Sequence, residues 1–569
     1  MKLLRKGYLK KRVIIAFMFI IIFTAALQYC VRNILFEHMV IYNSTVMGIK
    51  RGIINKDNKY KTLIIPDGVK VIGKNAFIDN TDIEEVVLPE SLVSIEDYAF
   101  AGCTGLKKIK FPQGLKKIGP FSFFGCESLE DIVFPDSLEY LIGGSFASCV
   151  NLKKVDFSES KTYIGLMTFK NCTSLKEVQL SENLTEIQKE AFYNCISLEK
   201  IYIPFNTQNI GSRAFMDCKN LKEVVLNRED ILLGAGAFIN TLWLSKLPTD
   251  DGYKYFSNIL MKYEGNERKV TVKDGIKSIA GGAFFDSPTL EEVVLPESLT
   301  VIGGSAFSCC QKLSYIDIPD NVELMGNKVF EACDSLERIV LPDRLRSLPQ
   351  YSFHQCKNLK EVILGSDLKD ILDNSFAECE NLKSINLNDK TRSIGDGAFE
   401  GCKKLTDIGD SSGVSFVGYN ALDDTPWYSS QEEVGGCKYV GNVLIECLDK
   451  KKTDIKLKEG TTMIGDLAFE GTKIYSLDFA KGIKIIGYRA FENCSNLSFA
   501  VIPDGVEYLG YDVFSSCKNL REIYVPESVK RVSFEVFGNG IFDKYKNIAV
   551  PNHLSGMFIY NGRARIKYY

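Results

Sequence analysis

Residues 92–112 read LVSIEDYAFAGCTGLKKIKFP, and this stretch decides the fold because its pattern returns through most of the chain. The repeated positions are L-x-x-I-x-x-x-A-F-x-x-C-x-x-L-x-x-I-x-[LF]-P. The aromatic position, Phe100 in this unit, recurs in three runs with a spacing of 23 residues and one step of 22. It marks 19 units, at Phe77, Phe100, Phe123, Phe146, Phe169, Phe192, Phe215, Phe238, Phe284, Phe307, Phe330, Phe353, Phe376, Phe399, Leu422, Phe469, Phe491, Phe514 and Phe537.

A unit of 23 residues cannot bury its own apolar side, so neighbouring units must stack and share one core. The alternation Ile109-x-Phe111 followed by Pro112 is typical of a short strand, because proline donates no hydrogen bond to a ladder. The sequence therefore predicts a β-rich repeat solenoid with one continuous parallel sheet. We expect residues 92–95 to form the opposite wall and Phe100 to fill the space between the walls.

The start of the repeat and its two interruptions share a second pattern. Ile53, Leu260 and Ile445 each lie 24 residues before the first aromatic position of a run, and polar turn residues follow, which indicates hairpin insertions. We predict three blocks that each begin with a hairpin, over residues 44–247, 248–431 and 432–551. Residues 552–569 are predicted to form an irregular C-terminal cap.

The N-terminus carries an export or anchoring signal. Six lysines and arginines lie within residues 2–12, and an uncharged apolar run follows over 13–27. We predict a transmembrane or signal helix over 1–31 and a linker over 32–43. The basic flank should stay in the cytoplasm and the repeat region should lie outside, either anchored at the cell surface or secreted after cleavage.

The composition narrows the classes of function. The 569 residues are 45% hydrophobic and 25% charged, as in folded proteins, and a net charge of −3 does not favour a nucleic-acid partner. Only His38, His354 and His553 occur, so a histidine-based metal site or general base is not expected. We predict no catalytic residue, no metal site and no cofactor.

One segment is similar to a catalytic motif. Residues 409–413 read GDSSG and fit G-x-S-x-G, but a nucleophile elbow needs a strand-to-helix turn and a histidine base, and this segment follows a repeat strand. Trp243 and Trp427 each lie five residues past the aromatic position and precede a predicted hairpin. We expect them to cover these junctions and not to bind sugar.

Thirteen of the 17 cysteines occupy one position of the repeat, where other units have Asn, Ser, Thr or Gly. This exchange indicates a small side chain that bonds a nearby backbone group, and not a disulfide partner. The spacing of these cysteines, without a C-x-x-C motif, does not support zinc. Cys437 and Cys447 differ because they flank the predicted hairpin turn Gly441-Asn442, and a bridge between them stays open as an alternative.

Two columns of strand residues are predicted to face solvent. In the first seven units the two residues after the Leu106-type position are all charged, with neighbours of mostly opposite sign such as Glu84 and Lys107, so these charges should neutralise one another. The next column is often apolar and is the candidate partner-binding surface, although β-propensity alone also explains it. Its members are Val87, Val133, Tyr202, Val225, Val294, Val340, Ile363, Val501 and Tyr524.

The repeat over residues 63–550 resembles the bacterial surface family called BspA-like leucine-rich repeat proteins, whose units share the pattern A-F-x-x-C-x-x-L-x-x-I-x-L-P. The resemblance implies a leucine-rich repeat solenoid on an exported cell-surface protein that serves adhesion or recognition without enzymatic chemistry. The implied partner is a protein or a glycan. The alternative is a structural surface spacer that binds no ligand.

Overall fold

The computed structural model describes residues 39–49, 61–157, 159–160, 163–478, 482–532, 547–554 and 566–568. Within these residues, no helix is both long and apolar enough to cross a membrane. The helix predicted over 1–31 lies outside the described residues. The chain divides into two compact units, Met1–Pro248 and Thr249–Tyr569.

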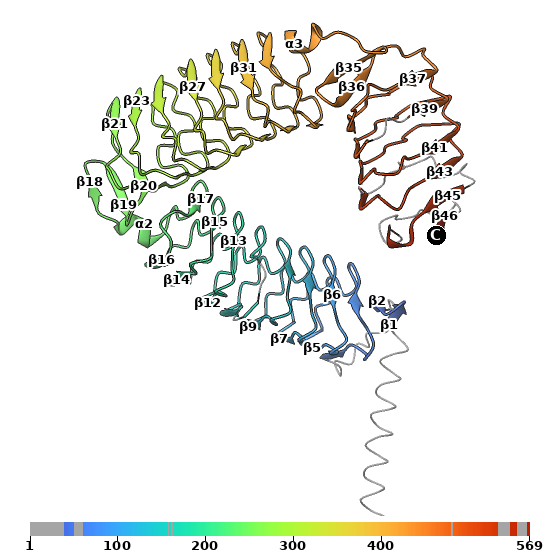
Figure 1. The fold of residues 1–569 in the computed structure, drawn as a ribbon. Helices are drawn as coiled ribbons and strands as arrows, with labels where there is room; N and C mark the ends of the chain where they lie inside the picture. Colours follow the sequence, from blue (N-terminus) through green and yellow to red (C-terminus); the bar gives the residue numbers. More distant parts are fainter. Residues whose placement is uncertain are drawn as a thin grey trace, which may run out of the picture. The chain divides into compact units, whose positions relative to one another are not determined.

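The coils contribute one strand to each of two walls, except that the coil of Ile164 has only an isolated bridge in the back wall. The front wall consists of strands of three or four residues, and the back wall consists of strands of two residues. Partner residues in both walls are parallel and 23 residues apart, as in Val86↔Ile109 of the front wall and Ile95↔Ile118 of the back wall. Figure 1 shows the coils of the first unit side by side between the strand β2 and the helix α2.

The first unit begins with a hairpin and ends with a short helix. The hairpin is β1 (Met39–Tyr42) and β2 (Thr45–Ile49), and the helix is α2 (Leu242–Lys246). The front wall comprises β3 (Thr62–Ile64), β5 (Glu85–Val87), β7 (Lys108–Lys110), β9 (Asp131–Val133), β11 (Lys154–Asp156), β12 (Glu177–Gln179), β14 (Lys200–Ile203) and β16 (Glu223–Leu226). The back wall comprises β4 (Val71–Ile72), β6 (Ser94–Ile95), β8 (Lys117–Ile118), β10 (Tyr140–Leu141), β13 (Glu186–Ile187), β15 (Asn209–Ile210) and β17 (Leu232–Leu233).

The second unit opens with β18 (Thr249–Asp250) and a hairpin of β19 (Tyr253–Phe256) and β20 (Ile259–Tyr263). Its first front strands are β21 (Lys269–Thr271), β23 (Glu292–Val294), β25 (Tyr315–Asp317), β27 (Arg338–Val340), β29 (Glu361–Ile363), β31 (Ser384–Leu387) and β33 (Asp407–Gly409). The matching back strands are β22 (Ser278–Ile279), β24 (Val301–Ile302), β26 (Leu324–Met325), β28 (Ser347–Leu348), β30 (Asp370–Ile371), β32 (Ser393–Ile394) and β34 (Phe416–Val417), and α3 (Pro426–Ser429) follows.

A further hairpin, β35 (Cys437–Val440) and β36 (Val443–Cys447), divides the second unit into two runs of coils. The later front strands are β37 (Asp454–Lys456), β39 (Ser476–Asp478), β41 (Phe499–Val501), β43 (Glu522–Tyr524), β45 (Asn547–Val550) and β46 (Ile566–Tyr568). The later back strands are β38 (Met463–Ile464), β40 (Ile485–Ile486), β42 (Tyr508–Leu509) and β44 (Arg531–Val532), and a 3-10 helix, η1 (Asn552–Leu554), lies near the end.

The turn that joins a back strand to the next front strand forms a third ladder. The Phe100 N–H donates to the Ser122 carbonyl of the next coil at 2.7 Å. The rings of Phe100 and Phe123 stack at a centroid distance of 5.2 Å, and both side chains are fully buried. The aromatic position of the repeat therefore fills the space between the walls, as the sequence predicts.

The prediction of one continuous parallel sheet is wrong. In the first unit the back strands form two further parallel sheets, one from β4 to β10 and one from β13 to β17, and the front wall is divided into three sheets, with breaks between β7 and β9 and between β12 and β14. The strands on either side of each break remain neighbours in the stack. Because a coil contributes only three or four residues to this wall, a small change in the rotation between coils removes the pairing.

The three hairpins pair with the coils in the same way, but the position differs from the predicted one at the first block and by one residue at the third. The Val46, Leu260 and Leu444 residues each pair with the first back strand, at Ile72, Ile279 and Ile464. The first hairpin thus lies earlier than predicted, and β1 occupies part of the segment predicted as a linker, while Ile53 lies outside the described residues. The constant offset of 24 fails because the paired residues are 26 apart in the sequence at the first hairpin, against 19 and 20 at the others.

The C-terminal segment is more regular than predicted. The strand β46 pairs in parallel with β45, in the register Ile548↔Ile566, Ala549↔Lys567 and Val550↔Tyr568. The front wall of the second unit therefore continues into the segment that the sequence analysis assigns to an irregular cap.

Candidate binding surface

The front wall exposes the apolar column that the sequence predicts. In β5, Glu85 and Val87 are exposed while Val86 between them is buried, which is the alternation of a strand with one solvated face. Eight members of the column keep between 36% and 62% of their surface exposed, and Val225 is half-buried beside Tyr202. The eight are Val87, Val133, Tyr202, Val294, Val340, Ile363, Val501 and Tyr524.

Charged residues of the front wall pair between coils. Lys107 Nζ lies 2.9 Å from Glu84 Oε2, and Lys153 Nζ lies 2.8 Å from Glu130 Oε2. Hydrogen bonds from Lys61 and Lys107 hold the pKa of the Glu84 carboxyl below its usual value. The predicted neutralisation of charges on neighbouring coils is confirmed for these pairs. The wall therefore has little net electrostatic field with which to attract a polyanion.

A groove, which we call the front groove, lies over β5 and β7 and extends to Glu130 and Asp131 at the break between β7 and β9. Its volume is about 570 Å³. Val87, Ile109 and Pro112 contribute apolar surface, and charged residues that include Lys108 and Glu130 also line it. Such a hollow with an apolar floor and a charged rim suits an apolar side chain of a protein partner.

The front groove lies beside a break in the ladder, and its residue types are those of the intact steps. Ile109 and Ile132 occupy the same position of the repeat, but Ile109 is half-buried and Ile132 is only 1% exposed. Val178, the inward residue beside the second break, is also half-buried. Sequence reasoning missed the groove because identical residue types occur at intact and broken steps of the ladder.

A second hollow, of about 380 Å³, lies at the junction of β34, α3, β36 and β38. Its lining carries the carboxylates of Asp423, Asp424, Glu446, Asp466 and Glu470. Burial raises the pKa of Asp466 to about 6. This acidic junction could not be predicted from the sequence, because its residues come from both sides of the hairpin insertion.

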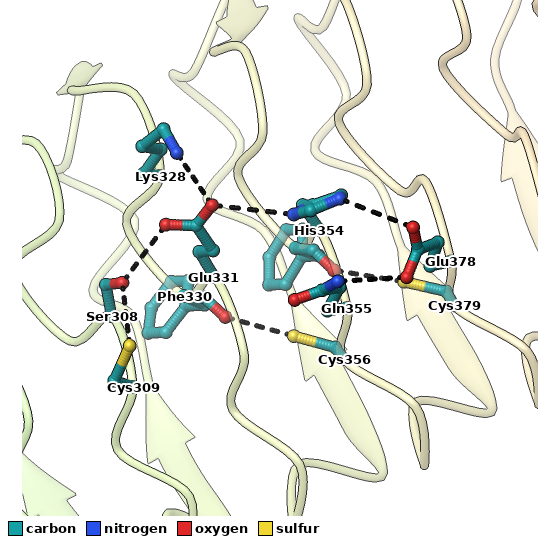
Figure 2. Close-up of polar contacts among 11 residues, drawn as sticks. Ser308, Cys309, Lys328, Phe330, Glu331, His354, Gln355, Cys356, Glu378 and Cys379 are labelled. Carbon is teal, nitrogen blue, oxygen red and sulfur yellow. Dashed lines mark hydrogen bonds and ion pairs between the residues drawn. The ribbon is translucent and has the colours of Figure 1, made fainter.

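The turn side of the second unit carries a polar cluster around His354, shown in Figure 2. His354 Nδ1 lies 3.4 Å from Glu331 Oε1, and His354 Nε2 lies 4.0 Å from Glu378 Oε1 of the following coil. Lys328 Nζ binds the same Glu331 carboxylate at 2.7 Å. This histidine is thus held between two carboxylates that link three neighbouring coils.

The segment that fits G-x-S-x-G is a turn of the front wall. The Ser412 N–H donates to Asp410 Oδ1 at 2.8 Å, and the next element is the back strand β34, not a helix. Because His354 is engaged two coils earlier, the segment lacks the geometry of a nucleophile elbow. In the described part of the chain, no group of three His, Cys, Asp or Glu side chains is placed to hold a metal ion.

The two tryptophans cover the ends of coil runs, as predicted. Trp243 lies in α2, is 6% exposed and meets the ring of Phe238 edge-on at 5.0 Å. Trp427 lies in α3 and is 9% exposed. With so little exposed ring surface, neither is available as a sugar platform.

The thirteen cysteines of the repeat position are buried free thiols. Each donates to the carbonyl of a phenylalanine in the preceding coil, as Cys356 Sγ does to the Phe330 carbonyl at 3.0 Å in Figure 2. In the third run Thr472 Oγ1 occupies this position and donates to the Phe469 carbonyl. The prediction of small side chains that bond the backbone is confirmed.

The sequence profile of the BspA type leucine rich repeat region matches residues 48–165, 143–266, 262–379, 323–431 and 447–556. These ranges cover most of the two walls. The chain belongs to this family. No curated protein sequence matches it.

Solved structures with the same repeat architecture include members described as leucine-rich repeat proteins. A leucine rich cell surface protein from Faecalibacterium prausnitzii is 22% identical, with 68% of this chain and 95% of that chain covered and a TM-score of 0.31. A leucine-rich repeat protein from Eubacterium ventriosum is 20% identical, with coverage of 68% and 90% and a TM-score of 0.31. The leucine rich repeat protein of T. pallidum is 31% identical over 30% of this chain and 86% of that chain, with a TM-score of 0.28.

Membership of the BspA type family accounts for the coil, the phenylalanine column and the cysteine position. It does not assign a ligand, because the outward residues of the front wall lie outside the repeated pattern. A function for this member must therefore be argued from the surface of its own front wall.

Proposed function

We propose that the repeat region lies outside the cell and binds a protein partner through the front wall of its first unit, with the front groove at the centre of the contact. The observation that carries this proposal is the groove of about 570 Å³, which is lined by β5 and β7 and ends at the open step between β7 and β9. Exposed apolar side chains around a hollow are the usual anchors of protein–protein contacts.

The distribution of exposed groups favours a protein over a glycan. The column next to the groove consists of aliphatic residues and tyrosines, such as Val87, Val133 and Tyr202. Carbohydrate recognition commonly uses exposed flat aromatic rings with a polar edge, and both tryptophans are buried. The paired charges of the wall also give no strong attraction for an anionic polysaccharide.

The extracellular location rests on the N-terminal sequence. Six cations precede the apolar run over 13–27, which favours a cytoplasmic N-terminus and an exported repeat region, anchored by residues 1–31 or released after cleavage. Protease added to intact cells should digest the repeat region and spare the N-terminus. Protection of residues beyond 49 would contradict export, and a mature N-terminus near Leu27 would replace the anchor by a cleaved signal.

Binding is tested with a fragment of residues 39–569 on an array of cell-surface proteins and glycans. We expect saturable binding to a protein, weakened by roughly 1–3 kcal/mol in Val87→Ser and in the pair Tyr202→Ala with Val225→Ser, because truncated interface anchors commonly cost that much. Tyr140→Ser is the matched control, since Tyr140 is 49% exposed on the back wall of the same unit.

Three other outcomes would decide against the proposal. Unchanged binding by the front-wall variants would move recognition elsewhere on the chain. Binding to glycans alone would replace the protein partner. The absence of any saturable ligand would favour the structural spacer.

A further inference from the structure

The three hairpins that begin runs of coils place different residues at one equivalent position. In each, the strand ends farthest from the turn are paired directly, and a bulge follows one residue later. The pairs are Met39↔Ile49, Tyr253↔Tyr263 and Cys437↔Cys447. The third hairpin thus brings two cysteines opposite each other where the second has two tyrosines.

In the second hairpin this pair holds the two strands together through their side chains. The rings of Tyr253 and Tyr263 lie 5.0 Å apart, and Tyr263 lies 5.2 Å from the first phenylalanine of the column, Phe284. The Tyr263 N–H donates to the Ala283 carbonyl at 2.8 Å, and the Cys447 N–H donates to the Ala468 carbonyl at 2.7 Å. The backbone setting is therefore the same, and only the side-chain link differs.

The backbone hydrogen bonds show that the cysteines form a non-hydrogen-bonded pair. The N–H and the carbonyl of Cys437 both bond Val434, and the Leu448 N–H donates to the Gly436 carbonyl at 3.0 Å. In such a pair the Cα atoms are about 4.5 Å apart and the side chains are closest. That separation lies within the range of about 4.4–6.8 Å that a disulfide spans.

The surroundings of these two thiols differ from those of the repeat cysteines. Both are fully buried, but Cys437 has no phenylalanine carbonyl as acceptor among the described residues, whereas all thirteen repeat cysteines have one. The interaction between the two sulfur atoms raises the pKa of Cys437 and lowers that of Cys447, as the interaction between the repeat cysteines Cys517 and Cys494 also does. Cys447 Sγ donates only a long hydrogen bond, of 3.9 Å, to the Asp449 carbonyl, so the two thiols interact mainly with each other.

We infer that Cys437 and Cys447 are a redox pair that forms a disulfide when the chain meets an oxidising medium. In the third hairpin this bond would link the two strands at the position where the Tyr253–Tyr263 contact links them in the second. The oxidant is a low-molecular-weight disulfide. The Cys447 thiolate attacks one of its sulfur atoms and releases one thiolate; Cys437 then loses its proton and attacks Cys447 Sγ, which releases the second. Two protein thiols are oxidised, one external disulfide is reduced to two thiols, and the two protons pass to the released groups.

The test is peptide mapping of the full folded chain after equilibration with either reduced or oxidised glutathione. Trypsin cleaves after Lys404, Lys438 and Lys450, so Cys437 and Cys447 fall in separate peptides, 405–438 and 439–450. We expect the two peptides to be joined in the oxidised sample, with a yield at least about tenfold above the reduced sample. Reduction before digestion should separate them.

The controls keep the result independent of folding and of any ligand. Alkylation of the native sample should leave the repeat cysteines unmodified, which shows that the chain is folded. Cys447→Ser should abolish the joined peptides, and Cys379→Ser should leave them, because serine is accepted at the repeat position, as in Ser287. Separate peptides from the oxidised, folded chain would overturn the inference, and so would linkage spread among the repeat cysteines.

Discussion

The step from β7 to β9 and the steps from β9 through β11 to β12 have the same repeat sequence but different front walls. At the intact steps the strands are paired, and Ile132 and Val155 are buried. At the open step the strands are unpaired, Ile109 is half-buried and the front groove appears. The phenylalanine column continues across both, since Phe100, Phe123 and Phe146 stack without interruption.

The packing of the core does not depend on continuous strand pairing in the front wall. The core and the turn ladder keep the coils together, so the front wall can open locally without ending the solenoid. The free energy of unfolding should therefore depend mainly on the buried columns, while partner binding should depend on the residues at the open step.

The largest expected effect concerns the repeat thiols on both sides of the open step. Burial raises the pKa of Cys103 and of Cys149 to about 12, from an ordinary value of 9.0. A higher pKa leaves less thiolate, so alkylation at pH 8 should be about a thousandfold slower in the folded chain than after unfolding. Peptide mapping of the alkylated chain measures this. Fast labelling of Cys103 alone would show that the opening reaches through to the turn side.

The next largest effect is the loss of a ring from the column. Phe192→Ala should lower the free energy of unfolding by roughly 3–5 kcal/mol, because Phe192 is fully buried and its removal leaves a cavity between the walls. In a Trp427→Phe background Trp243 is the single remaining tryptophan, so its fluorescence reports the unfolding of the first unit in a urea titration. A loss below about 1 kcal/mol would mean that the column is not the main source of stability.

A smaller and more specific effect separates the open step from the intact one. Ile132→Ala should cost about 2–4 kcal/mol of unfolding free energy, and Ile109→Ala should cost at least about 1 kcal/mol less, because Ile109 already contacts solvent. The same urea titration measures the unfolding free energy of both variants, which carry the same substitution at the same repeat position of two neighbouring coils. Equal losses would contradict the opening between β7 and β9.

The smallest effect is expected for the paired charges. Glu84→Gln removes the carboxylate that binds Lys61 and Lys107, but both lysines are exposed and Glu84 is half-buried, so solvent screens the interaction. The urea midpoint should not change measurably, in low or in high salt. A clear destabilisation that disappears in salt would show that charge pairing, and not the core, sets the register.

The sequence alone determined the coil but not its local openings. The 23-residue spacing of Phe100 and its counterparts requires stacked coils, and the exchange of Cys103-type residues with serine and threonine correctly indicated backbone-bonded thiols. The exposed apolar column was also predictable, because it follows from strand alternation. These features depend on one coil and its neighbour, and the repeat pattern contains both.

The front groove and the register of the first hairpin could not be predicted in this way. Ile109 and Ile132 are the same residue in the same position, so the open step depends on small rotations summed over several coils. The first hairpin was misplaced because loop length, unlike coil length, is not fixed by packing. Cys437 and Cys447 were recognised as unusual, but their direct pairing depends on a bulge that the sequence does not mark.

The most direct test of recognition by the front wall is hydrogen–deuterium exchange of the repeat region, with and without the protein partner found on the array. The account predicts that partner binding slows exchange at residues 85–90 and 107–112, which line the front groove, and leaves the turn side around Phe121 unchanged. Protection confined to the turn side or the back wall, with unchanged exchange at 107–112, would contradict the account.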